Sequence, residues 1–192
     1  FYRLFVFALP LLFNTEFVLN LWLKEVPENT VGFVQLFLIF SLCESLARPM
    51  VTALLATGDI RNYQIIVGGL QLMNLPVSYV LLSNGCDAEV TVVVSIVISV
   101  ICIFVRLFIM KRQMNFHVRS FFRRVFVNIV SVTAAAAIIP LCVCRFIPET
   151  VAGSLANLTL VFLCACLSVL FAGCTRSERR ELISIVLKRS KV

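Results

Sequence analysis

Charged residues are scarce in this sequence, and their scarcity excludes most classes of soluble protein. Asp, Glu, Lys and Arg make up 14% of the 192 residues, whereas apolar residues make up 60%. An ordinary soluble domain is about 25% charged and about 45–50% apolar. The mean hydropathy of +1.01 points the same way. The composition therefore indicates an integral membrane protein.

The sequence also lacks the patterns that carry enzymatic chemistry. It contains no glycine-rich phosphate loop, no Ser-His-Asp set, no paired carboxylates in one loop and no cluster of metal ligands. Its single histidine, His117, lies in a basic segment without a companion ligand. We therefore expect no enzyme, no bound metal and no cofactor, and any transport by this chain would not be driven by ATP.

Six apolar segments follow one another along the chain. Each holds the roughly 17–25 residues that a transmembrane helix needs. Short connections with breaker residues such as Pro27, Gly58 and Pro148 separate them. The expected spans are 4–23, 31–56, 63–83, 89–110, 122–144 and 151–174. The sequence therefore predicts an all-α, polytopic transmembrane helix bundle over 1–174, followed by a basic tail over 175–192.

Two clusters of positive charge orient these spans. The segment 111–124 contains five Lys or Arg residues and no acid, and the tail 175–192 contains six. Two spans separate the clusters, so both lie on one side of the membrane, and the positive-inside rule makes that side the cytoplasm. We expect both termini of the chain to be cytoplasmic and the amphipathic tail to lie on the inner leaflet. Membrane topology thus explains the net charge of +7 without a nucleic-acid partner.

Opposite charges lie inside the second span. Glu44 and Arg48 are four residues apart, so a helix places them on one face, with the acid first, which is the better order for an ion pair. A charge near the middle of a span costs at least ~2.5–3.5 kcal/mol unless it faces protein or water. The pair is either a structural clamp between helices or the lining of a transport cavity. Arg106, near the inner end of the fourth span, is expected to snorkel to the surface.

Further polar and helix-breaking residues lie within the spans. Glu16 and Asn74 are the other candidates for a substrate or ion pathway, although Glu16 could equally meet a neighbouring helix or the headgroup layer. Asn74 can form a hydrogen bond across a helix interface. Pro10, Pro49 and Pro76 each remove a backbone donor within a span and are predicted to bend it.

A family resemblance rests on three stretches. They are Asn20-Leu-Trp-Leu-Lys-Glu-Val-Pro27, Leu54-Leu-Ala-Thr-Gly-Asp-Ile-Arg-Asn-Tyr-Gln-Ile-Ile-Val-Gly-Gly69 and Leu72-Met-Asn-Leu-Pro-Val-Ser-Tyr79. Together they resemble the second half of Wzx-type lipid-linked oligosaccharide flippases, which share a superfamily with MATE drug exporters and the lipid II flippase. The resemblance covers about residues 5–110. The family usually has Gly where this chain has Lys24, and Lys-x-Lys where it has Asp59 and Arg61.

The resemblance implies a transporter of two repeated lobes, of which this chain is most of the C-terminal lobe and the N-terminal lobe is missing. It implies alternating-access flipping of an undecaprenyl-pyrophosphate-linked oligosaccharide across the bacterial inner membrane, for surface polysaccharide or lipopolysaccharide assembly. Arg48 would meet the anionic pyrophosphate, while Glu44 would tune Arg48 or bind a coupling Na⁺ or H⁺. Membrane lipids, glycan polymerases and glycosyltransferases would be its other partners.

The sequence leaves two alternative functions open. A MATE-type, cation-coupled drug antiporter would use Glu44 as its cation site. A non-transporting membrane scaffold in a glycan-assembly complex would use the small-residue faces of the last two spans, which suit tight helix packing.

Overall fold

The structure is a computed structural model, and it describes the residues 1–23, 25–27, 29–58, 60–114, 127–129, 131–134, 136 and 151–169. Every regular element in this part of the chain is a helix, which confirms the all-α prediction. Three helical segments are long and apolar enough to cross a membrane, namely Thr30–Ala56, Ile60–Ser83 and Glu89–Arg112. A fourth crossing results if the broken pair Tyr2–Phe13 and Thr15–Trp22 forms one span.

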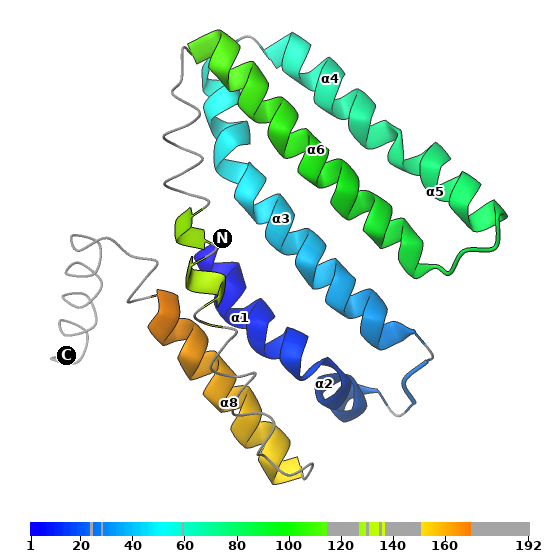
Figure 1. The fold of residues 1–192 in the computed structure, drawn as a ribbon, viewed down its shortest axis with the longest axis vertical. Coiled ribbons are helices and arrows are strands. Elements are labelled where there is room, and N and C mark those ends of the chain that lie inside the picture. The colour runs from blue at the N-terminus through cyan, green and yellow to red at the C-terminus, as the bar shows by residue number, and fades with distance from the viewer. Residues whose placement is uncertain are drawn as a thin grey trace, which may run out of the picture. The chain divides into compact units, whose positions relative to one another are not determined.

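Contacts divide the chain into two compact units (Figure 1). Unit 1 comprises Phe1 and Thr15–Ser120, and unit 2 comprises Tyr2–Asn14 and Phe121–Val192. The described helices of unit 1 are α2 (Thr15–Trp22), α3 (Thr30–Ala56), α4 (Ile60–Leu72), α5 (Asn74–Ser83) and α6 (Glu89–Met114). Those of unit 2 are α1 (Tyr2–Phe13) and α8 (Val151–Ser168).

In unit 1, α6 lies between α3 and the consecutive helices α4 and α5 (Figure 1). The long helices α3 and α6 run in the same direction. Near their beginnings, the carboxylate of Glu89 lies over Gly32. Further along both helices, Ser99 donates a hydrogen bond to Glu44. Both contacts join positions at a similar distance from the start of each helix. The two helices therefore lie side by side with the middle of α3 next to the middle of α6.

One face of α6 is buried over most of the helix. Its buried positions recur every three or four residues, which is the period of a helix face. They include Val92, Ser99, Cys102, Arg106 and Met110. Because Ser99 bonds to a residue of α3, this face is turned toward α3. The interface between the two helices therefore contains a hydroxyl and a guanidinium as well as apolar groups.

Two of the expected spans are each divided into two helices. The span predicted at 63–83 is interrupted at Met73, one turn before Pro76, whose ring lacks the N–H that the preceding turn requires. The span predicted at 4–23 is interrupted at Asn14. There the side-chain amide of Asn14 donates to the carbonyl of Pro10 at 3.1 Å, a local hydrogen bond of the kind that competes with helix propagation.

Unit 2 is described through α1 and α8, which pack against each other. The rings of Phe7 and Phe162 lie 5.7 Å apart between their centroids. The amide of Asn157 donates to Oδ1 of Asn14 at 3.0 Å, so a neutral polar contact joins the two helices. The span expected at 151–174 is helical as far as Ser168. Most of the span expected at 122–144, and the basic tail, lie outside the described residues.

Candidate intramembrane polar site

The site begins with a hydrogen bond between α3 and α6. Ser99 donates from its hydroxyl to Oε1 of Glu44 at 2.7 Å. Ser99 is only 3% exposed, and Glu44 is half-buried. Ala47 is buried one turn after Glu44, so Glu44 lies at the edge of the packed face of α3, which also includes Met50 and Leu54. A charge-assisted hydrogen bond of this kind is about twice as strong as a neutral one.

A second hydrogen-bonded group joins α5 to α6. Asn74, the first residue of α5, donates from Nδ2 to the hydroxyl of Ser95 at 3.0 Å. Its Oδ1 accepts from the Ser78 hydroxyl at 3.3 Å, and Ser95 in turn donates to the carbonyl of Thr91 at 2.9 Å. The interruption at Met73 brings Asn74 to the start of a new helix. The amide of Asn74 is therefore oriented by two helical residues, Ser78 and Ser95.

These two groups line one small cavity. Its volume is about 190 Å³, and its walls are formed by Phe40, Glu44, Gln71, Asn74, Ser95, Ile98 and Ser99. The lining offers one carboxylate, two carboxamides and two hydroxyls, and it contains no cationic side chain. Carboxylate, carbonyl and hydroxyl oxygens are suitable ligands for hard cations. The carboxylate of Glu44 can alternatively bind a proton. Within the described ranges, no group of three or more His, Cys, Asp or Glu residues is arranged to hold a metal ion.

Arg106 lies on the same face of α6, about two turns beyond Ser99. It is 3% exposed, so the expectation that it snorkels to the surface is wrong. Among the residues that the structure describes, no group accepts a hydrogen bond from its Nε or its Nη1. Leaving a buried charged donor unsatisfied costs more than about 1–3 kcal/mol. The spacing of Ser99, Cys102 and Arg106 along one helix face is the sequence signal that would have placed Arg106 inside.

The other predicted charges lie elsewhere. Arg48 is exposed, and the structure records no ion pair between Arg48 and Glu44, both of which it describes. Glu16 is exposed in the first turn of α2, where the helix dipole favours an acid. The structure therefore brings together Glu44 and Asn74 from the predicted set, adds Ser95 to them, and leaves Arg48 and Glu16 outside the cavity lining.

The three predicted bending prolines occupy different contexts. Pro10 lies inside α1 and is buried, whereas Pro49 lies inside α3, which continues unbroken to Ala56. Pro76 lies in the first turn of α5, where its missing N–H is tolerated. Of the three, Pro76 is the one that directly follows a helix interruption next to the cavity.

Comparison with known proteins assigns no role to the residues of this site. No protein-family model, no curated protein and no solved structure matches the chain. The chemistry of the site therefore rests on the residues that line the polar cavity and on Arg106.

Proposed function

We propose that this chain is one lobe of a secondary transporter that flips an undecaprenyl-pyrophosphate-linked oligosaccharide across the bacterial inner membrane. The observation that carries the proposal is the cavity around Glu44, in which a carboxylate and amides are gathered among helices apolar enough to cross a membrane. Ionisable groups in such a position mark substrate or ion pathways by default. The helix interruption at Met73 adds support, because broken helices commonly border transporter sites.

The buried cation Arg106 supports one division of roles among the charges. The substrate would carry an anionic pyrophosphate. Arg106, whose Nε and Nη1 have no acceptor among the described residues, would meet it in a conformation that opens the buried face of α6. Arg48, the cation that the sequence alone favours, is exposed and does not line the Glu44 cavity. Glu44 would take a coupling Na⁺ or H⁺, because its cavity offers oxygen ligands and no competing cation. Driving force would then come from an ion gradient rather than from ATP.

The charge pattern supplies the expected orientation of the transporter. Figure 1 shows the start of α4 and the end of α6 at the same end of unit 1. The first turn of α4 carries Arg61, and the last turn of α6 carries Lys111 and Arg112. By the positive-inside rule this end would face the cytoplasm, where lipid-linked repeat units are assembled. The remaining lobe of the same protein, membrane lipids and glycan-assembling enzymes would be its partners.

A gene-deletion experiment tests this function in the cell. A strain that lacks the full gene should lose surface polysaccharide and accumulate lipid-linked repeat units on the cytoplasmic side, and the wild-type gene should reverse both changes. Normal surface polysaccharide together with no accumulation would overturn the proposal. If the full-length protein co-purifies with glycosyltransferases but moves no substrate in proteoliposomes, a scaffold in a glycan-assembly complex is the better description.

A MATE-type drug antiporter is a second candidate, and the Glu44 cavity favours it. A half-buried carboxylate without a paired cation suits an organic or inorganic cation as substrate. Proteoliposomes that hold the full-length protein separate the two functions. Ion-coupled efflux of cationic dyes without any movement of lipid-linked glycan would select the antiporter.

A further inference from the structure

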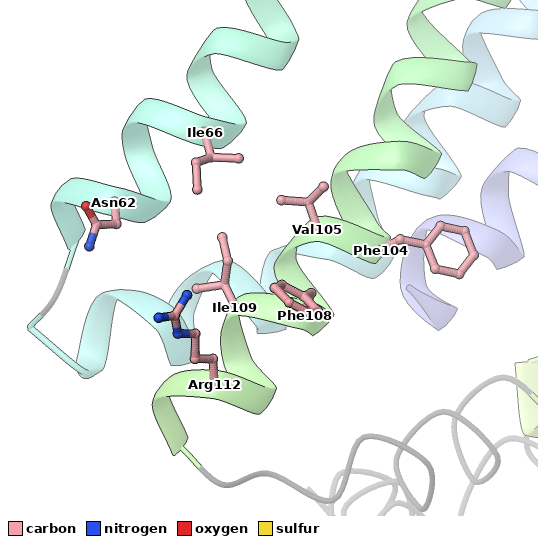
Figure 2. A pocket seen from close by; sticks show the side chains of 7 residues that line it. All are labelled: Asn62, Ile66, Phe104, Val105, Phe108, Ile109 and Arg112. Atoms are coloured by element: carbon pink, nitrogen blue, oxygen red, sulfur yellow. The ribbon is translucent and has the colours of Figure 1, made fainter.

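A larger hollow lies between α4 and α6, on a different part of unit 1 from the Glu44 cavity (Figure 2). Its volume is about 810 Å³. Five of the side chains that line it are apolar, namely Ile66, Phe104, Val105, Phe108 and Ile109. Several of these are open to the surroundings, and Phe108 is 68% exposed. We call this hollow the α4–α6 groove.

The polar groups of the groove are gathered at one end. Figure 2 shows Asn62, from the first turns of α4, and Arg112, from the last turns of α6, at the same end of the gap. Neither side chain is hydrogen-bonded or ion-paired within the described part of the chain. Arg61 and Lys111, which are their sequence neighbours, are exposed at this end too. The groove is therefore apolar along its length and cationic at one end.

We propose that the α4–α6 groove binds one molecule of an anionic phospholipid. Its acyl chains would lie against Phe104, Val105 and Phe108, and its phosphate would meet Arg112 and the amide of Asn62. Charge complementarity selects this occupant. Basic pockets between transmembrane helices bind anionic headgroups, and apolar walls beside such a pocket suit the attached chains.

The combination of apolar walls and a cationic end favours an anionic phospholipid over other occupants of the groove. Free phosphate would use Arg112 but would leave the apolar walls without a partner. A helix from another protein would cover Phe108 but would leave the cationic end without an anion. A zwitterionic lipid would fill the same walls without the net negative charge. The proposal concerns lipid binding alone, so it holds or fails independently of the flipping function.

The charged end is tested with the full-length protein in detergent, by counting bound lipids with native mass spectrometry. The probes are dioleoyl phosphatidylglycerol, dioleoyl phosphatidylcholine and inorganic phosphate. The wild type should bind phosphatidylglycerol more tightly than phosphatidylcholine. Arg112→Gln should weaken phosphatidylglycerol binding about five-fold, the effect expected for one cation near a lipid surface. Lys111→Gln is the matched control, because it removes an adjacent exposed cation that does not line the groove.

Three results would overturn the charged-end argument. Equal losses in Arg112→Gln and Lys111→Gln would mean that diffuse attraction, rather than this groove, holds the lipid. Equal binding of phosphatidylglycerol and phosphatidylcholine to the wild type would remove the role of charge. Competition by inorganic phosphate as effective as that by the lipid would remove the role of the chains.

The apolar walls are tested by filling the groove. Ile66→Trp places a larger side chain in the lining and should weaken phosphatidylglycerol binding at least about five-fold, with unchanged circular dichroism. Ile65→Trp is the matched control, because Ile65 is exposed on the same helix and does not line the groove. Unchanged lipid binding in a folded Ile66→Trp protein would contradict the proposal.

Discussion

Asn14 in unit 2 and Glu44 in unit 1 are both polar side chains among apolar helices, yet they are satisfied differently. Asn14 accepts from Asn157 and donates to the Pro10 carbonyl, so a neutral amide uses both of its ends in local contacts. Glu44 carries a potential charge, accepts from Ser99 and borders an open cavity. Arg106, on the same face of α6 as Ser99, is buried, and its Nε and Nη1 have no acceptor among the residues that the structure describes.

Neutral and charged polar side chains affect the stability of a helix bundle differently. Neutral amides between membrane helices stabilise their association by roughly 0.6–2 kcal/mol each, and nothing further is needed to explain them. Buried charges without full pairing lower stability, so stability does not explain their presence. We therefore interpret the Asn14–Asn157 contact as a packing feature, and we propose that Glu44 and Arg106 are the charges that handle ions or substrate.

The largest expected effect comes from removing the buried cation. Arg106→Met should stabilise the full-length protein by about 1–3 kcal/mol, because a side chain of similar length no longer buries unsatisfied donors. It should also abolish flipping in proteoliposomes. Unfolding in detergent and lipid flipping are the two measurements. Lys111→Met, an exposed cation on the same helix, is the control, and a strongly destabilised Arg106→Met protein would make Arg106 a structural residue.

The neutral contact of unit 2 should behave in the opposite way. Asn14→Leu removes the Asn157–Asn14 hydrogen bond between α8 and α1 and should lower the free energy of unfolding by about 1–2 kcal/mol. Flipping per folded molecule should not change. Asn20→Leu, at an exposed position of α2, is a control of the same chemistry. A loss of transport in the folded Asn14 variant would end the distinction between the two units.

The smallest effect is expected at the beginning of the α3–α6 interface. A Cβ atom at Gly32 would meet the carboxylate end of Glu89. Because that end belongs to a flexible side chain, it can move aside, and Gly32→Ala should cost less than about 1 kcal/mol. The double variant with Glu89→Ala should recover the loss in an unfolding experiment. A cost of several kcal/mol would mean that the backbones, rather than one side chain, are in close contact there.

Much of unit 1 is predictable from the sequence alone. The spans expected at 31–56 and 89–110 correspond closely to α3 and α6, because long uninterrupted apolar runs leave little choice of structure. The interruption at Met73 follows from Pro76. The sequence does not predict the interruption at Asn14, whose backbone N–H and side-chain amide both donate to the carbonyl of Pro10.

The composition of the site was less predictable than the helices. Glu44 and Arg48 share a helix face by spacing, but the partner of Glu44 is Ser99, which lies 55 residues away in the chain. That pairing depends on the register between α3 and α6, which a one-dimensional pattern does not contain. Arg106 was expected at the surface because it lies near a helix end, whereas its burial is decided by the face of α6 that it occupies.

The most direct test of the transport role is to neutralise Glu44 without removing its hydrogen bond. Glu44→Gln keeps an oxygen that accepts from Ser99, so the thermal stability of the full-length protein should stay close to that of the wild type. The flipping rate should be measured in proteoliposomes with an imposed ion gradient. We predict that flipping falls at least about ten-fold and no longer responds to the gradient, because the carboxylate proposed to take the ion is gone. Unchanged, gradient-dependent flipping by the folded Glu44→Gln protein would contradict the role assigned to this cavity.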